Sequence, residues 1–375
     1  MAGIYIHIPF CKQACHYCDF HFSTNMRPKR EMLAAIQQEL SLQKDYLAPY
    51  EVSSIYLGGG TPSLLEVEEI AALLNHIQQT FICKEILEVT LEANPDDIYL
   101  EKLLALRTIG INRLSIGIQT FHNNLLQYLN RAHNTTKATQ SLEIALQSGF
   151  NNFNLDLIYA IPGQTEEMLK KDLLTALQFK PTHISAYCLT IEQKTVFGRW
   201  LETGKIRIVE DEIAAKHFHL LVDTLTDNRY KHYEISNFSL PEHHAQHNTN
   251  YWKRGSYLGV GPGAHSYNGT SRQYNIANNM RYIQSIQEGV IPSTIEILQP
   301  QDHINEYIMT SLRTQWGCDM ALLRNNYQYD LQVNHPSYLE QLTSRQLAYV
   351  QEDTLILTID GKLLADKIAA DLFIA

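Results

Sequence analysis

The chain has no long apolar run and no dense cluster of basic residues. Nothing in its 375 residues approaches the roughly 18 consecutive apolar residues of a membrane-spanning helix, so we expect no such span. The first ten residues contain no basic leader followed by an apolar stretch, so we expect no secretory signal and a cytoplasmic protein, with peripheral membrane contact left open. The 30 basic residues are outnumbered by 40 acidic ones, which argues against nucleic acid and favours a small-molecule or protein partner.

Cysteine is scarce, but three of the six cysteines lie close together near the N-terminus. Cys11, Cys15 and Cys18 form the pattern C-x3-C-x2-C. Three neighbouring cysteines cannot all pair with one another, and an intracellular chain keeps its thiols reduced, so disulfides are not expected. The other three are scattered through apolar surroundings, and we expect small buried hydrophobic residues at Cys83, Cys188 and Cys318.

Three thiolates suit an open inorganic centre. A [4Fe-4S] cluster has four irons, so three protein thiolates leave one iron free to chelate a small ligand. A closed structural zinc site needs a fourth protein donor, which His16 or Asp19 could supply. The triad favours the cluster, and zinc stays open as the alternative.

Strand-like apolar runs alternate with amphipathic helical runs through the first half of the chain. The expected strands are 4–8, 54–57, 87–91, 113–118, 153–158 and 184–189, and the expected helices are 30–47, 67–80, 99–108, 137–147 and 166–178. Six alternations predict an α/β fold whose parallel sheet is either open or curled into a partial barrel. The ligand should then lie at the carboxyl ends of the strands.

Motifs with chemical potential follow successive predicted strands. They are Cys11, the glycine turn 58–62, the segment 92–95, Gln119 and Asp156. Each alone has an ordinary interpretation, because glycines make turns, Asn-Pro stops strands and a single Asp caps a turn. Five separate ordinary explanations at five successive strand ends are much less probable than one shared role. We therefore expect these motifs to lie together at one rim of the sheet.

The second half of the chain has a different character. A helix is expected over 211–226, followed by a Tyr- and His-rich stretch and then the glycine-rich segment 258–265. That segment lacks the flanking strand, the helix and the acidic residue of a dinucleotide-binding motif, so we reject this interpretation. The tail from about 299 predicts helices and then a hairpin over 347–364 that turns at Asp360 and Gly361, compatible with a winged-helix-like domain.

The ordered motifs together resemble the radical S-adenosylmethionine superfamily, along essentially the whole chain. The segments that carry the resemblance are 5–10 with the cysteine triad, 58–62, 92–95, 115–121 and 156–159. The resemblance implies a partial (β/α)6 TIM-like barrel over residues 1–270, including a heme-motif extension, and a smaller C-terminal α/β, winged-helix-like cap over 271–375. It also implies a [4Fe-4S] cluster on Cys11, Cys15 and Cys18.

By the same resemblance, further residues would contact S-adenosylmethionine. Backbone N–H groups of a glycine turn can approach a zwitterionic ligand where a Cβ would clash. The residues implied are Gly59, Gly60, Thr61, Tyr5, Glu92, Gln119, Arg131 and Asp156, with Tyr17 packing near the cluster.

More narrowly, these motifs resemble the branch of the superfamily that contains oxygen-independent coproporphyrinogen dehydrogenases and the HemW-type heme chaperones. Two features favour the chaperones within that branch. The dehydrogenases carry a further cysteine two positions after the third ligand, where this chain has Phe20. Residues 247–252 match the H-N-x-x-Y-W motif of the chaperones, which implies heme contacts for His247, Tyr251 and Trp252. As alternatives, His247 has a purely structural role, or the ligand is one of its neighbours in sequence, His243, His244 and His265.

The resemblance therefore implies a heme chaperone that binds heme and transfers it to an acceptor hemoprotein, such as a membrane-associated respiratory protein. An electron donor for the cluster is a further implied partner, and no catalytic residue is assigned. The first alternative is an oxygen-independent coproporphyrinogen III dehydrogenase. The second is a radical enzyme that acts on an unrelated substrate.

Overall fold

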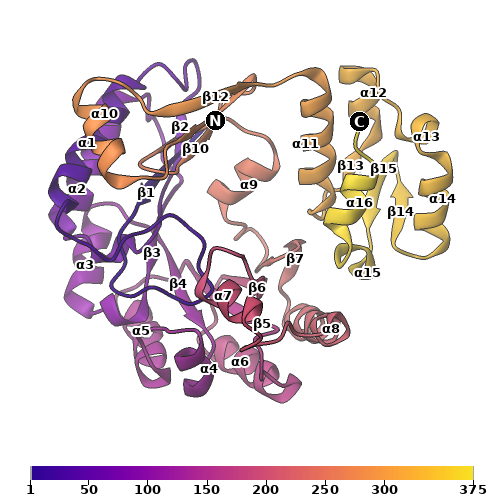
Figure 1. Cartoon of the computed structure of the whole chain (residues 1–375), viewed down its shortest axis with the longest axis horizontal. Helices are drawn as coiled ribbons and strands as arrows, with labels where there is room; N and C mark the ends of the chain where they lie inside the picture. The colour runs from indigo at the N-terminus through magenta and orange to yellow at the C-terminus, as the bar shows by residue number, and fades with distance from the viewer. Residues whose placement is uncertain (1, 375) are drawn as a thin grey trace.

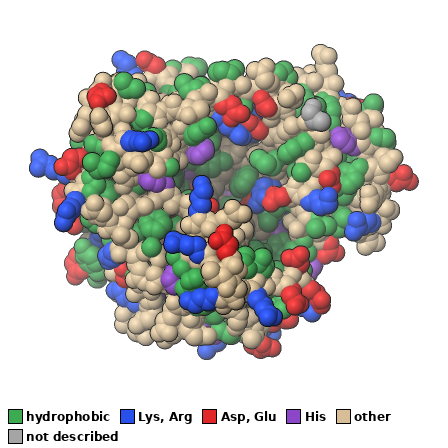
Figure 2. All heavy atoms as spheres, in the orientation of Figure 1, with side chains coloured by type: hydrophobic (Ala, Val, Ile, Leu, Met, Phe, Trp, Pro, Cys, Tyr) green, Lys and Arg blue, Asp and Glu red, His purple; other side chains and the backbone are tan. Residues whose placement is uncertain are grey.

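The computed structural model describes residues 2–374, which form two bodies of secondary structure (Figure 1). The larger body is built on a 12-stranded sheet and the smaller on a three-stranded sheet. No helix in this part of the chain is long and apolar enough to cross a membrane. On the face drawn in Figure 2, basic side chains are interspersed with acidic ones, and the surface is hollowed near its centre.

Six parallel strands pair in chain order and confirm the predicted alternation. They are β1 (Ala2–Ile8), β2 (Val52–Gly59), β3 (Glu88–Ala93), β4 (Arg113–Gln119), β5 (Phe153–Tyr159) and β6 (His183–Cys188). The crossover helices are α1 (Lys29–Leu42), α2 (Val67–Thr80), α3 (Leu100–Thr108), α5 (Thr135–Gln147) and α6 (Glu166–Gln178), with the short α4 (Asn123–Tyr128) before α5. The first helix ends at Leu42, before the expected 47.

Successive residues of these strands face opposite sides of the sheet, as strand geometry requires. One set, which includes Ile4, Leu91, Ile116 and Leu155, belongs to the main hydrophobic core. The alternate set is largely polar, and its members Glu92, Arg113, Ser115, Asn154, Asp156 and Ser185 line a cavity. The barrel thus has an apolar side toward its helices and a polar interior.

The sheet extends beyond the six parallel strands on both edges, in the order β12-β11-β10-β9-β1-β2-β3-β4-β5-β6-β8-β7. The added strands are β7 (Lys231–Glu234), β8 (Asn237–Ser239), β9 (Tyr257–Val260), β10 (His265–Tyr267), β11 (Ser271–Asn275) and β12 (Ser293–Ile297). The expected absence of a strand beside segment 258–265 is wrong, because β9 ends at Val260. The segment then leads to the antiparallel strand β10 and not to the helix of a dinucleotide site.

The expected domain boundary between residues 270 and 271 falls inside this sheet, just before β11. Helix α10 (Asn279–Gln287) follows β11, and its Tyr282 and Ile286 belong to the main core. The second core begins at Ile304, in α11 (Pro300–Leu312). We propose that the domains divide near Pro300 instead.

The C-terminal body packs helices around a small antiparallel sheet. Its elements after α11 are β13 (Cys318–Asp319), α12 (Met320–Tyr327), α13 (Leu331–Asn334), α14 (Pro336–Ser344), β14 (Ala348–Gln351), β15 (Thr354–Leu357), α15 (Ile359–Lys362) and α16 (Ala365–Asp371). The expected turn at Asp360 and Gly361 is wrong, because the hairpin turns at Glu352 and Asp353, whose φ angles are 47° and 66°. Two consecutive left-handed residues make the tight turn that two-residue hairpins favour.

The remaining helices connect these parts. They are α7 (Val196–Glu202), α8 (Asp211–Asp227) and α9 (Gln246–Trp252), with 3-10 turns at Pro62–Leu64 and Pro95–Asp97. Helix α8 confirms the helix expected over 211–226. Helix α9 lies between the large sheet and the C-terminal helices in Figure 1.

Candidate functional site

A cavity of about 430 Å³ lies among the carboxyl ends of the parallel strands. Most of the residues expected to form the site line it: Cys11, Cys15, Cys18, Tyr17, Gly59, Gly60, Thr61, Glu92, Gln119, Arg131 and Asp156. The structure therefore brings together the motifs that follow successive strands. Tyr5, His247, Tyr251 and Trp252 do not line the cavity.

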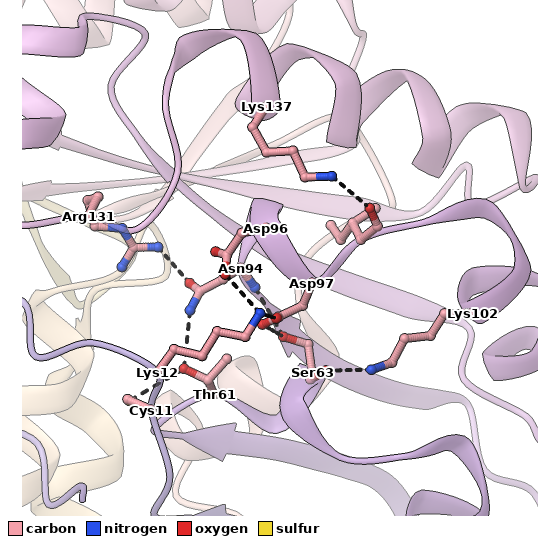
Figure 3. Close-up of polar contacts among 11 residues, drawn as sticks. Cys11, Lys12, Thr61, Ser63, Asn94, Asp96, Asp97, Lys102, Arg131 and Lys137 are labelled. Atoms are coloured by element: carbon pink, nitrogen blue, oxygen red, sulfur yellow. Dashed lines mark hydrogen bonds and ion pairs between the residues drawn. The ribbon is translucent and has the colours of Figure 1, made fainter. Parts of the chain in front are cut away.

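Lys12 anchors the cysteine-bearing loop to the end of β3 (Figure 3). Its ammonium group pairs with Asp96, 3.0 Å away, and with the buried Asp97. Asp97 also accepts a hydrogen bond of 2.9 Å from Ser63, whose carbonyl accepts one of 2.6 Å from Lys102. The loop position is thus fixed by charge as well as by backbone contacts.

A chain of hydrogen bonds joins the glycine turn to the cysteines (Figure 3). The hydroxyl of Thr61 donates to the Cys11 sulfur at 3.4 Å and accepts a 3.1 Å hydrogen bond from the Asn94 amide. Asn94 in turn accepts a hydrogen bond of 2.6 Å from Arg131. Asn94 belongs to the segment 92–95, but the sequence indicates no specific role for it. In the structure it links two expected site residues, Thr61 and Arg131.

Arg131 carries a positive charge with no carboxylate partner within ion-pair distance among residues 2–374. Its Nη1 lies 3.4 Å from the Cys15 sulfur and 3.4 Å from the Tyr17 hydroxyl, and its Nη2 donates to the Gly117 carbonyl at 2.9 Å. Its Nε is buried and has no partner in this part of the chain. Such a guanidinium suits an anionic ligand, because a cation kept from water needs a counter-charge.

The thiols of Cys11, Cys15 and Cys18 line one cavity. No three His, Cys, Asp or Glu side chains within residues 2–374 gather at one point as a mononuclear metal site requires. His16 is occupied elsewhere, because its Nδ1 lies 2.9 Å from the Tyr128 carbonyl and its ring packs 4.7 Å from the Trp200 ring. The closed zinc alternative therefore loses His16 as its fourth ligand, whereas Asp19, its other candidate, lines the cavity with the thiols. Three thiolates fit a [4Fe-4S] cluster, which leaves one iron open.

Burial raises the pKa of two of these thiols. The pKa of Cys18 rises to about 12, and that of Cys11 also rises, although the hydrogen bond from Thr61 opposes the shift. Iron binding must therefore displace protons from these sulfurs.

The glycine turn packs tightly under the cysteine-bearing loop. Gly59 has a φ of 104°, and a Cβ there would lie 2.5 Å from Nδ1 of His7. A Cβ on Gly60 would lie 2.6 Å from the Phe10 carbonyl oxygen. Both positions need glycine for internal packing, in addition to the approach of a ligand that the resemblance implies.

Among the carboxylates that line the cavity, Glu92 and Asp156 lie on its strands. Glu92 accepts hydrogen bonds from the Tyr56 hydroxyl at 2.8 Å and from the Gly59 N–H at 3.2 Å, and burial raises its pKa to about 7. Asp156 accepts bonds from Asn154 at 2.7 Å and Ser115 at 3.2 Å, and burial raises its pKa too. These groups can bind cationic or hydroxyl parts of a ligand.

Gln119 and Tyr5 differ in how they relate to this cavity. Gln119 ends β4 with a φ of 68°, where the register with β5 shifts, and its side chain lines the cavity. The Tyr5 ring instead stacks at 6.1 Å on Tyr56, and its hydroxyl lies 3.2 Å from Nδ1 of His7. Tyr5 therefore contacts cavity residues without facing the cavity itself.

The cavity floor contains residues that our sequence analysis missed. They are Tyr56, Arg113, Ser115, Asn154, Ser185 and Tyr187. Arg113 is buried, and within residues 2–374 its one hydrogen bond reaches the Thr90 hydroxyl at 3.5 Å. The sequence does contain a signal for these floor residues. Polar residues recur at every second position within otherwise apolar strands, and this pattern indicates a polar barrel interior.

Helix α9 places the H-N-x-x-Y-W segment at the opposite end of the barrel from the cysteines. The backbone N–H groups of Gln246 and His247 donate to Glu88, at the start of β3, at 2.8 and 3.2 Å. Nδ1 of His247 lies 2.9 Å from the Ser54 hydroxyl, near the start of β2, whereas the cysteines follow the end of β1. Of this helix, only Asn248 reaches the cavity.

The expected heme ligand is enclosed by protein groups in this structure. His247 is buried, its Nε2 lies 2.6 Å from the Tyr251 hydroxyl, and its ring stacks on Tyr56. Burial lowers its pKa to about 3, with a further contribution from Arg113. The ring of Trp252 lies 5.6 Å from the guanidinium of Arg313, in the C-terminal body. Heme ligation by His247 would require one of its ring nitrogens to leave its present partner, Ser54 or Tyr251.

The three cysteines outside the triad differ in exposure. Cys318 is buried as expected, but Cys83 is half-buried. Cys188 is exposed at the end of β6 and lines the cavity, so its expected burial is wrong. The apolar sequence around Cys188 belongs to a strand whose last two residues leave the core.

Comparisons with known proteins place this site in a family. Residues 5–176 match the Radical SAM superfamily. The chain is 35% identical over 372 residues to the heme chaperone HemW of Bacillus subtilis (strain 168), covering 98% of each chain. It is 32% identical to HemW of Mycobacterium tuberculosis (strain ATCC 25618 / H37Rv), covering 99% of this chain and 94% of the relative.

The solved structure of HemN, the coproporphyrinogen III oxidase of Escherichia coli, has the same fold. It superposes with a TM-score of 0.85 at 23% identity, covering 99% of this chain and 90% of HemN. The large body is therefore a partial barrel of the radical SAM type, followed by a small antiparallel C-terminal sheet. Similarity to HemW along nearly the full length shows that the chain belongs to the HemW family of the radical SAM superfamily.

Proposed function

We propose that this protein is a heme chaperone, which binds heme and transfers it to an acceptor hemoprotein. The observation that carries the proposal is the near full-length similarity to HemW, in a chain whose three N-terminal thiols line a polar cavity. An acceptor in the respiratory chain and an electron donor for the cluster are the partners we propose. We also propose a cytoplasmic location, since six free cysteines suit a reducing compartment.

In this proposal Cys11, Cys15 and Cys18 hold a [4Fe-4S] cluster, and the adjoining cavity holds S-adenosylmethionine. Arg131 supports this placement, because its charge next to the thiols has no carboxylate partner among residues 2–374. Glu92 and Asp156 offer acceptors for the amino and hydroxyl groups of the ligand. When bound, the cluster would supply an electron to the sulfonium of S-adenosylmethionine.

The residues of this chain hold the site in place and control its access to water. Lys12 fixes the loop that carries the thiols, and Asn94 keeps the Arg131 guanidinium aligned with Thr61. Arg113 and Asn154 form part of the polar floor, and Asn248 of helix α9 also reaches the cavity. These contacts pre-organise the pocket, so that ligand binding need not order it.

Heme titration and a turnover assay together test the proposal. Anaerobically reconstituted protein should give a saturable Soret band on addition of hemin, and should not convert coproporphyrinogen III to protoporphyrinogen. A protein that binds no heme saturably is not a chaperone of this kind. Efficient turnover would assign it instead to the coproporphyrinogen dehydrogenases, the alternative that Phe20 argues against.

A further inference from the structure

A second depression lies beside the cysteine-bearing loop, and we name it the edge groove. It has a volume of about 940 Å³ and lies between residues 19–22 and the strands β10 to β12. Its walls include Phe20, Phe22, His265, Tyr274 and Pro292. This volume is at the upper end of the range of about 300–1,000 Å³ that is typical of small-molecule sites.

His265 presents an imidazole to this groove. It is the exposed first residue of β10, and its ring stacks on Tyr274 of β11 with centroids 5.6 Å apart and an interplanar angle of 27°. Neither ring nitrogen of His265 has a hydrogen-bond partner within residues 2–374, in contrast to His247. Partial burial and the nearby Arg272 lower its pKa, so the ring is neutral at pH 7 and its lone pair can coordinate iron.

Large aromatic side chains flank this imidazole. Phe20 is 67% exposed and Tyr274 is 42% exposed, although rings of this size are usually buried. Ile276 and Pro292 add an apolar wall. Flat, apolar walls suit a porphyrin, whose faces must leave water while its charged propionates stay hydrated at the open side.

The groove adjoins the proposed cluster site. Phe20 and Phe22 line both the edge groove and the cavity at the strand ends, and Phe20 is the second residue after Cys18. A ligand in the groove would therefore contact the segment 20–22, which directly follows the proposed cluster ligand Cys18 and its neighbour Asp19. His21 also lies in this wall, but its Nε2 is 2.7 Å from the Asn279 side chain, which leaves His265 as the less engaged donor.

We propose that heme binds in the edge groove, with His265 as axial ligand to the iron and with Phe20 and Tyr274 against the porphyrin. This inference rests on the proposed function and states where the protein binds heme. It differs from the expectation for His247, which lies at the other end of the barrel.

Spectroscopic titration with hemin tests the assignment. Wild-type protein should show a saturable Soret shift, which His265→Ala should lose or weaken at least tenfold, and added imidazole should restore the shifted spectrum. Phe20→Ala should weaken binding without removing the ligand signature. His76→Ala serves as the control, because His76 lies on helix α2, outside the groove, and it should titrate like wild type.

Two results would overturn the assignment while leaving the proposed function standing. One is wild-type affinity and an unchanged spectrum in His265→Ala. The other is loss of the Soret shift in a folded His247→Gln variant but not in His265→Ala, which would make His247 the ligand. If wild-type protein itself binds no heme saturably, the proposed function fails instead.

Discussion

Nη1 of Arg131 lies 3.4 Å from the sulfur of Cys15, and both residues line the cavity at the strand ends. This contact joins a thiol expected to hold iron to a guanidinium expected to face a carboxylate. Substitution of Arg131 removes the guanidinium but keeps all three thiols. Such a variant therefore separates loss of ligand binding from loss of the cluster.

We predict that Arg131→Met weakens binding of S-adenosylmethionine to the reconstituted protein by about tenfold or more. The reason is the loss of charge-assisted hydrogen bonds, each of which contributes about 1.5–3 kcal/mol. Calorimetric titration under anaerobic conditions measures the affinity. Arg199→Met is the control, because Arg199 is exposed on α7. Equal affinity in Arg131→Met and wild type would contradict the placement of the ligand.

We predict that Cys15→Ala loses the iron, the acid-labile sulfide and the brown colour that wild-type protein acquires on anaerobic reconstitution. Two thiolates cannot hold a cluster that needs at least three protein ligands to leave one iron open. Iron and sulfide analyses measure the loss. Cys83→Ala should keep wild-type content, because Cys83 lies outside the cavity. Retention of iron and sulfide in Cys15→Ala would revive other metal assignments.

We predict that Lys12→Met lowers the free energy of unfolding by about 1–3 kcal/mol and slows cluster loading. The substitution leaves the buried carboxylate of Asp97 with Ser63 but without its cation. Thermal and urea denaturation measure stability, and absorbance measures loading. Lys84→Met removes an exposed ion pair with Glu51 and should change stability by less than about 0.5 kcal/mol. Similar effects of the two substitutions would show that Lys12 does not anchor the loop.

Glu92 should make the stability of the ligand-free protein depend on pH. Its pKa in the folded chain rises from 4.5 to about 7, so the unfolded chain releases this proton first as pH increases. Stability is therefore lost between about pH 4.5 and 7, by up to about 2–3 kcal/mol from this group. Glu92→Gln should be more stable than wild type above pH 7 and similar near pH 4.5.

Urea denaturation at several pH values checks this prediction. The exposed Glu85→Gln should follow the wild-type profile and serves as the control. If Glu92→Gln and wild type lose stability in parallel across this pH range, the buried carboxylate is not the origin of the dependence.

The parallel half of the fold was predictable because its signals are local. Strands such as 113–118 have an apolar residue at every second position, and helices such as 67–80 repeat their apolar residues at helical spacing. Motifs at the carboxyl ends of parallel strands must then meet at one edge, so Cys11, Glu92 and Asp156 were placed correctly around a common cavity.

The antiparallel part of the fold could not be predicted in this way, because it is held by contacts between polar groups far apart in the sequence. Strand β11 has the polar sequence Ser-Arg-Gln-Tyr-Asn, and it is held by the bonds of Gln273 to Gln43 and of Asn275 to the buried Glu39. No hydrophobic pattern marks such a strand, so the sequence predicts a boundary at 270/271, whereas we propose one near Pro300. The position of His247 was hidden for the same reason, because its partner Ser54 lies 193 residues earlier in the chain.

Heme transfer tests the central claim most directly. Protein loaded with one equivalent of hemin is mixed with an apo-hemoprotein acceptor, separated from it, and both fractions are scanned for the Soret band. The account predicts that the heme moves from this protein to the acceptor, and that the acceptor's own spectrum appears. Failure to bind one equivalent, or retention of all heme in the presence of a competent acceptor, would contradict it.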